Sequence, residues 1–185
     1  LKGRDHLVEL FDVILNKTVV SIDYKPFDKE KINYIVSPYF LKQYNSRWFL
    51  FAYNEAVKSL SNLALDRIIH IEECASPYIE NNDINFEEYF EDVVGVTASS
   101  NTEPSTVPLK VSPSLYPYIE SKPIHGSQRV MEKSDAHTLI ELTVQINYEF
   151  ISQIFSYGES ITVNAPEELK QIIKSKAKKI LENYK

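Results

Sequence analysis

The chain begins with apolar residues at helical spacing. Over residues 5–16, apolar positions gather on one side of a helix and polar positions lie between them. This pattern predicts an amphipathic helix whose apolar side packs against the rest of the protein. The apolar set is Leu7, Val8, Phe11, Ile14 and Leu15.

Five short apolar runs follow, separated by residues that are typical of turns. A helix followed by short strands, with no crossover helices between them, predicts a small antiparallel barrel, because closure removes the exposed edges of so small a sheet. The run that begins at Arg47 is apolar on both faces and is the predicted central strand, entered through a hairpin turn at Tyr44-Asn45-Ser46. The predicted strands are 19–24, 32–36, 47–53, 60–65 and 68–71.

The pattern changes between residues 74 and 105, where Ser, Asn, Thr, Pro and acidic residues dominate. Residues 73–104 carry eight acidic side chains and no basic one, whereas residues 1–72 and 105–185 each hold ten basic and nine acidic groups. The net charge of -6 therefore belongs to this segment. We predict an acidic linker at 74–105, most flexible at 98–105, between a domain at 1–73 and a domain at 106–185.

Strand and helix patterns alternate in the second half of the chain. Apolar residues at 140, 142, 144 and 146 alternate with polar ones, which predicts a strand with one covered face and helices on one side of the sheet. A short helix is predicted at 114–120 behind Pro113. Asn147 is predicted to cap a further helix that ends at Gly158. The order βαββαβ plus a terminal helix predicts a ferredoxin-like sandwich, so the fold class is α+β.

The final helix, which Pro166 is expected to open, carries two stripes. One stripe is apolar and is predicted to be buried; it consists of Leu169, Ile172, Ile173, Ala177, Ile180 and Leu181. Beside it runs a stripe of lysines, Lys170, Lys174 and Lys178. A solvated outer face is the favoured interpretation of the lysines, and a dimer or DNA-facing surface is the alternative.

Composition excludes several classes of protein. Hydrophobic residues make up 43% and charged residues 25%, as in soluble globular domains, and no apolar run approaches the roughly 20 residues that span a bilayer, so a cytoplasmic protein is expected. Cys74 is the single cysteine, which excludes a disulfide within the chain and a cysteine zinc site. The histidines are scattered, and no phosphate-binding loop or nucleophile motif is present. We expect no enzyme, no metal and no cofactor.

Short motifs in the first half resemble the WYL family of bacterial transcription factors. They are Pro38-Tyr39, where the proline ends a strand in the family pattern, Leu41-Lys42, Arg47-Trp48-Phe49-Leu50 and Leu65-Asp66-Arg67-Ile68, with Tyr24 at the end of the first strand. The second half is similar to the C-terminal extension that often follows WYL domains, through Pro123-Ile124-His125, Ser127-Gln128, Asn147, Gly158 and Pro166. The resemblance covers nearly the whole chain.

The resemblance implies an Sm-like or SH3-like barrel that binds an effector, usually behind a DNA-binding helix-turn-helix. That domain is missing, and the sequence starts at Leu1, so we expect a truncated chain that acts on DNA through the missing part and forms a homodimer. Some members sense nucleotide-like ligands or single-stranded nucleic acid, where arginines neutralise phosphate and aromatic faces stack on bases. The expected ligand-binding residues are Tyr24, Lys42, Arg47, Tyr53 and Arg67.

The sequence departs from the family pattern at three positions. Tyr34 and Ser61 stand where a basic residue is often found, and Phe49 stands in place of a tyrosine. Two positive charges are thus missing from the usual anionic pocket. Simpler interpretations stay open: Trp48 as a core side chain, Arg67 as the salt-bridge partner of the adjacent Asp66, and the whole chain as a dimerisation or protein-interaction module without a ligand.

Overall fold

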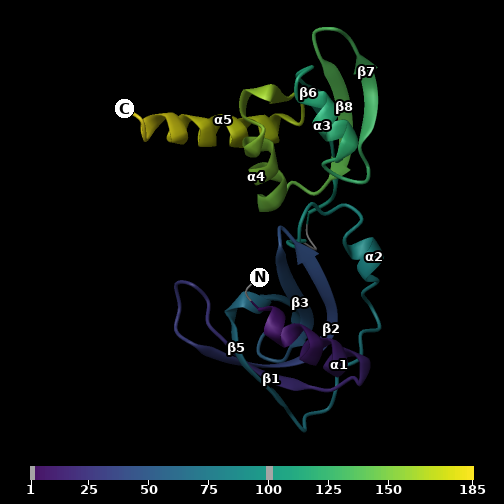
Figure 1. The fold of residues 1–185 in the computed structure, drawn as a ribbon, viewed down its shortest axis with the longest axis vertical. Helices are drawn as coiled ribbons and strands as arrows, with labels where there is room; N and C mark the ends of the chain where they lie inside the picture. Colours follow the sequence, from purple (N-terminus) through teal and green to yellow (C-terminus); the bar gives the residue numbers. More distant parts are fainter. Residues whose placement is uncertain (1–2, 99–101) are drawn as a thin grey trace. The chain divides into compact units, whose positions relative to one another are not determined.

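The computed structural model describes residues 3–98 and 102–185. The chain divides into two compact units, Leu1–Phe86 and Glu87–Lys185, each with its own sheet and core (Figure 1). Within the segment 74–105, the amide of Ile79 donates to Ser37 Oγ in the first unit, whereas Val93 and Val94 are buried in the second. This segment is therefore shared between the units. The flexible point predicted at 98–105 includes residues 99–101, which lie outside the described part of the chain.

In the first unit, residues 3–86 form a helix and five antiparallel strands in the order β4-β3-β2-β1-β5. All five predicted strands are present. The predicted hairpin turn is confirmed too, since Asn45 and Ser46 have φ values of 47° and 60°, as tight hairpin turns of type I′ require. The elements are η1 (Arg4–His6), α1 (Leu7–Leu15), β1 (Val20–Tyr24), β2 (Ile32–Tyr44), β3 (Arg47–Asn54), β4 (Ser59–Ala64), η2 (Leu65–Arg67) and β5 (Ile68–Glu73).

Two details of the first sheet differ from the sequence prediction. The predicted closed barrel is not present, because β4 and β5 form the two edges of the sheet and the three-residue turn η2 joins them without ladder pairing. In addition, β2 does not end at Val36 but continues through Pro38 to Tyr44. The pairing of β2 with β3 shifts register between Pro38 and Phe40, and this bulge accommodates a proline that has no N–H to donate.

Helix α1 covers one face of this sheet (Figure 1). Its fully buried residues are Leu10 and Val13, which pack with strand residues such as Ile22 and Leu50. Val8 and Phe11, which we predicted on the packed side, are 72% and 55% exposed. The buried stripe is therefore rotated away from the predicted one, towards positions that the periodicity alone did not single out.

The described residues of the second unit form four antiparallel strands in the order β7-β8-β6-β9 and three helices of six or more residues. The short helix α3 begins after Leu115, with Pro117 rather than Pro113 in its first turn. The elements are α2 (Phe86–Tyr89), in which the boundary between the units falls, β6 (Ser105–Val111), α3 (Tyr116–Ser121), β7 (Arg129–Lys133), β8 (Thr138–Val144), α4 (Tyr148–Ser156), η3 (Gly158–Ser160), β9 (Ile161–Val163) and α5 (Glu167–Glu182).

The core of the second unit lies between one face of its sheet and the helices, as predicted. Ile140, Leu142 and Val144 of β8 are fully buried and pack with apolar residues of α3 and α4. Asn147 caps α4, since its side chain accepts a hydrogen bond from the amide of Phe150, and Gly158 follows the helix with a φ of 56°. The predicted N-cap at Asn147 and the predicted helix end at Gly158 are therefore confirmed.

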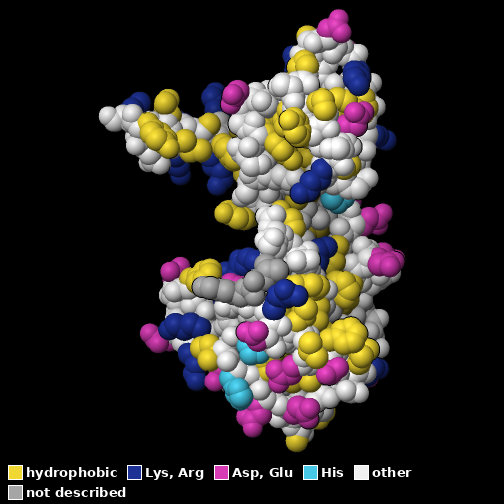
Figure 2. Space-filling model, viewed as in Figure 1, with side chains coloured by type: hydrophobic (Ala, Val, Ile, Leu, Met, Phe, Trp, Pro, Cys, Tyr) yellow, Lys and Arg dark blue, Asp and Glu magenta, His cyan; other side chains and the backbone are white. Residues whose placement is uncertain are grey.

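Helix α5 departs from its predicted burial. Only Leu169 is fully buried, whereas Ile180 and Leu181 are 48% and 61% exposed. The reason is that the later turns of α5 extend beyond α4 and the sheet of the same unit (Figure 1). Yellow hydrophobic and dark-blue lysine side chains lie side by side along this part of the helix (Figure 2).

Candidate ligand-binding site

The two faces of β3 have different environments. Leu50 and Ala52 point into the core beneath α1, so residues of the opposite parity face the other side of the sheet. On that second face, Phe51 is covered by the ring of Phe86, which also stacks on Phe40 at 4.7 Å between ring centres. We call this second face, on β2, β3 and β4, the outer face.

The outer face carries three of the predicted site residues, Lys42, Arg47 and Tyr53, as the pairing of β2 with β3 shows. Lys42 is the cross-strand partner of Phe49, and Arg47 and Tyr53 lie two residues before and four residues after Phe49 on β3. Burial lowers the pKa of the Lys42 ammonium below its ordinary value. Three of the five predicted site residues thus share one face of the sheet.

Arg47 is held by an aspartate from η2. Its Nε and Nη2 atoms donate to Asp66 Oδ1 at 3.1 and 2.8 Å, and Nη2 also donates to Oδ2 at 2.9 Å. The Arg47 side chain is 38% exposed and that of Asp66 is 14% exposed. Because the carboxylate occupies the guanidinium fork, Arg47 serves to anchor η2 to β3. The sequence interpretation that paired Asp66 with Arg67 is wrong.

Arg67 has a different environment. Its guanidinium carbon lies 4.1 Å from the ring centre of Phe27, and Phe27 itself is 71% exposed. The Nε atom of Arg67 is buried and has no hydrogen-bond partner, and no ion pair of this arginine is present, among the residues that the structure describes. A stacked guanidinium without a carboxylate partner retains its capacity to bind an anion.

Backbone contacts fix the position of η2. The carbonyl of Arg67 accepts a hydrogen bond from the amide of Lys25, which begins the loop that carries Phe27. On another side, Gly3 has a φ of 82°, and a Cβ there would lie 2.5 Å from the carbonyl carbon of Leu65. Only glycine allows this close approach. The chain before α1 and the β1–β2 loop therefore both hold the segment that presents Arg67.

Tyr24 does not join this site. It is 6% exposed within the core of the first unit, and its hydroxyl accepts a hydrogen bond from the amide of Ala64 at 3.3 Å. Tyr34, at one of the positions that is often basic in the family, packs against the same core with its ring 6.1 Å from that of Tyr24. Both tyrosines have structural positions on the side of the sheet that α1 covers.

Trp48 is half-buried and packs against the core under α1, in agreement with its interpretation as a core residue. One side of the indole remains at a groove of about 420 Å³, which is lined by Leu7, Val8, Phe11 and Leu41 as well. The groove contains almost no polar atoms.

Phe27 is the neighbour of Arg67 that the sequence pattern did not single out. It lies in the turn Lys25-Pro26-Phe27-Asp28, where an apolar ring has no strand or helix to bury it. An aromatic residue in such a turn was the available signal. Its pairing with Arg67 depends on the return of the chain through η2, which no local pattern encodes.

The described residues contain no group of three or more His, Cys, Asp and Glu side chains that could hold a metal ion. Cys74 Sγ lies 3.3 Å from Ser76 Oγ. His125 acts as a turn residue, because its Nδ1 accepts from the amide of Ser127 at 3.2 Å.

Within the part of the chain that the structure covers, no helix combines the length and the apolar character needed to cross a membrane.

Comparison with protein families identifies both units. Residues 5–73 match the WYL domain and residues 103–181 match the WCX domain. A search of curated proteins gave no match.

Two solved structures are similar to this chain. Proteasome accessory factor B/C (PafBC) of Arthrobacter aurescens is 14% identical, with a TM-score of 0.43 over 92% of this chain and 26% of that chain. The crystal structure of a CRISPR Cas-related protein is 10% identical, with a TM-score of 0.56 over 98% of this chain and 52% of that chain. The chain therefore spans about half, or less, of the length of these two proteins.

Proposed function

We propose that this chain, which is a WYL domain followed by a WCX domain, is the effector-sensing region of a bacterial transcriptional regulator. The motifs around Trp48 and Arg67 support this role, because the WYL resemblance implies an effector-binding module. The proposal includes transmission of the signal to a DNA-binding domain. The fold shared with a CRISPR Cas-related protein at a TM-score of 0.56 is consistent with the architecture.

The finer fold assignment is part of the same proposal. We infer an open Sm-like sheet for the WYL unit, since β2 pairs with β1 through its first half and with β3 through its second half. We infer a ferredoxin-like sandwich for the WCX unit, since its strands are ordered β7-β8-β6-β9 and are antiparallel throughout.

The proposed ligand is a nucleotide-like molecule or a single-stranded nucleic acid. The observation that carries this proposal is the Arg67 guanidinium, which has no carboxylate partner among the described residues and lies on the exposed ring of Phe27. Such a pair offers a positive charge for phosphate and an aromatic face for a base. Lys42 and Tyr53, on the outer face, are the additional candidate contacts, whereas Arg47 and Tyr24 are assigned structural roles.

The test is fluorescence anisotropy of the full chain with a labelled single-stranded oligothymidylate at several salt concentrations. Arg67→Ala should weaken binding by about tenfold and reduce the slope of log K against log salt by about 0.7, the value for one lost phosphate contact on a single strand. Phe27→Ala should weaken binding to a similar extent but leave the salt slope unchanged, because stacking releases no counterions.

Arg129→Ala is the matched control, because Arg129 is an exposed arginine of the WCX unit that pairs with Glu141. It should bind like the wild type. If wild type, Arg67→Ala and Phe27→Ala all bind equally well, or if none binds, the nucleic-acid proposal is wrong.

A homodimer is a second proposal, supported by the exposed apolar residues Ile180 and Leu181 in the last turn of α5 and Tyr184 just after it. Light scattering of the purified chain tests it. A mass that stays at the monomer value up to high concentration would rule out this association.

A further inference from the structure

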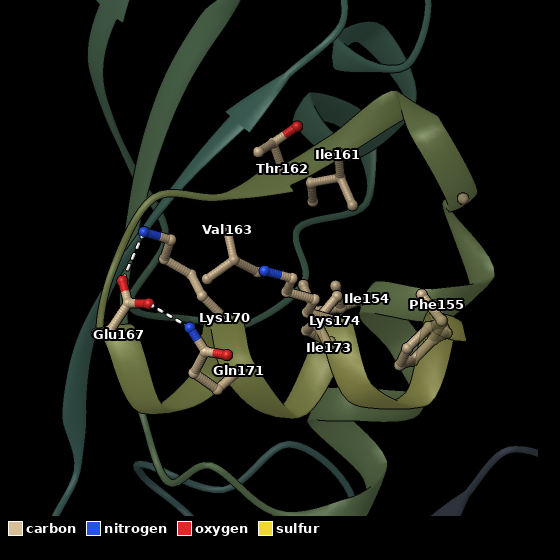
Figure 3. Close-up of a pocket in the computed structure, with 12 residues that line it drawn as sticks. Ile154, Phe155, Ile161, Thr162, Val163, Glu167, Lys170, Gln171, Ile173 and Lys174 are labelled. Carbon is tan, nitrogen blue, oxygen red and sulfur yellow. Dashed lines mark hydrogen bonds and ion pairs between the residues drawn. The ribbon is translucent and has the colours of Figure 1, made fainter. Parts of the chain in front are cut away.

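We infer that the WCX unit contains a second ligand site, a cavity of about 560 Å³ between β9, α4 and α5 that accepts a small amphipathic anion (Figure 3). By this we mean a molecule with an apolar body and one anionic group. The site is independent of the Arg67–Phe27 pair, which belongs to the WYL unit.

The cavity exists because the sandwich is incomplete at this edge. Among the described strands, β9 is an edge strand of its sheet and pairs with β6 alone, so none of them covers the space between β9 and α5. Two lining residues have little or no side chain: Gly158, where a Cβ would meet no atom within 4 Å, and Ala177 of α5. The cavity therefore results from the strand order of the sheet and from the small side chains at these two positions.

The interior of the cavity is apolar. Figure 3 shows Ile161 and Val163 of β9 pointing towards Ile154 of α4 and Ile173 of α5. Both β9 side chains are 7% exposed. A volume of about 560 Å³ falls within the range of small-molecule sites, which is roughly 300–1,000 Å³. This part of the site suits a hydrocarbon or aromatic body.

Two lysines on successive turns of α5 provide the charge at the rim. Lys170 Nζ donates to Glu167 Oε2 at 2.6 Å, and Gln171 Nε2 donates to Glu167 Oε1 at 2.6 Å (Figure 3). These two hydrogen bonds hold the pKa of the Glu167 carboxyl below its ordinary value, so the carboxylate stays charged and neutralises Lys170.

Lys174 carries the remaining positive charge. Its ammonium makes no hydrogen bond or ion pair with any described residue, although its charge is a minor cause of the lowered pKa of Glu167. Figure 3 shows its side chain extended towards Val163. A cation at the rim of an apolar cavity is complementary to a single anionic group on an apolar body. Lys178, one turn further along α5, does not line the cavity. The lysine stripe is therefore divided between the site and the solvated surface.

The probe for the test is 1-anilinonaphthalene-8-sulfonate, compared with N-phenyl-1-naphthylamine, which has the same rings and no charge. Both are titrated into the full chain and followed by fluorescence. Lys174→Met should weaken sulfonate binding by up to about fivefold, as expected for one exposed ion pair, and leave the neutral probe unaffected. Lys178→Met, the matched control, should change neither probe. Ala177→Leu should weaken both, because it fills the cavity.

Amide chemical-shift mapping of the same titration locates the bound probe, and the spectrum of each variant reports that it is folded. Shifts at Val163, Ile173 and Lys174 are expected. Sulfonate binding that is insensitive to both Lys174→Met and Ala177→Leu would overturn the inference. Shifts confined to the groove at Phe11 and Trp48 would overturn it as well, since that groove belongs to the WYL unit.

Discussion

Hydrogen bonds from Tyr39 and Tyr78 hold the segment that follows β5 against the bulge of β2. Tyr78 donates its hydroxyl to the carbonyl of Pro38 at 2.7 Å, and Tyr39 donates to the carbonyl of Ile79 at 2.8 Å. The two rings meet edge to face with 6.1 Å between their centres. Burial, and then the proximity of Tyr39 and Glu80, raises the pKa of Tyr78 to about 12.

This raised pKa predicts a loss of stability at alkaline pH. In the unfolded chain Tyr78 ionises near its ordinary pKa of 10.0, so its contribution to folding is fully present below pH 10 and is lost as the pH rises towards 12. The free energy of unfolding in urea, measured at about pH 9 and about pH 11.5, should fall less in Tyr78→Phe than in the wild type. Tyr118→Phe, at a residue 73% exposed, should fall like the wild type. An identical fall in all three proteins would contradict the assignment.

Arg47 and Arg67 illustrate how far the sequence predicts a site at the scale of residues. Both positions could be singled out by resemblance, but their roles could not. Asp66 is adjacent to Arg67 in the chain, yet it bonds to Arg47 because η2 turns its side chain towards β3. Phe27 meets Arg67 only in the folded chain, because it lies forty positions earlier in the sequence. Partners across strands depend on register and turns, which composition does not encode.

At the scale of elements, α4 is fixed at its beginning by Asn147. The Oδ1 atom of Asn147 accepts from the amide of Phe150 at 2.8 Å, and Nδ2 donates to the carbonyls of Val94 at 2.8 Å and Thr97 at 2.9 Å. One side chain thus caps the helix and ties down the segment before β6.

Two substitutions of Asn147 should separate these roles. Asn147→Asp keeps the capping oxygen and loses the donor, so it should cost about 1 kcal/mol of the free energy of unfolding. Asn147→Ala loses both and should cost about 2 kcal/mol. Urea unfolding measures both changes, and hydrogen exchange of the Phe150 amide, which donates to Asn147 Oδ1, should increase in Asn147→Ala alone. Equal costs for the two variants would mean that the cap contributes nothing.

The elements themselves were largely predictable, because alternation and terminal residues are local signals. The predicted strands at 19–24, 47–53, 60–65, 68–71 and 140–146 and the cap at Asn147 agree with the structure, whereas β2 is longer than its pattern indicated. The exposed end of α5 could not be predicted in the same way. Its apolar stripe continues to Leu181, but the number of turns that are covered depends on the size of the unit that packs on it.

At the scale of the whole molecule, two separate cores predict two separate unfolding events. Trp48 is the only tryptophan and belongs to the WYL unit, so its fluorescence reports on that unit alone. Leu10→Ala should destabilise the WYL unit by about 2–5 kcal/mol and lower the urea midpoint of the Trp48 signal. Leu142→Ala, at an equally buried leucine of the WCX unit, should leave this midpoint unchanged while circular dichroism detects the loss. A common shift of both signals would mean that the units unfold together.

The open sheet of the WYL unit has a consequence for behaviour at high concentration. An unclosed sheet leaves two strand edges where a foreign chain could add and begin aggregation. Here β4 carries Ser59, Ser61 and Asn62, and β5 carries His70, Glu72 and Glu73. Hydroxyl, amide and carboxylate groups on an edge favour water over a neighbouring strand. The polar side chains of β4 and β5 therefore reduce the tendency of these two edges to pair with a strand of another molecule.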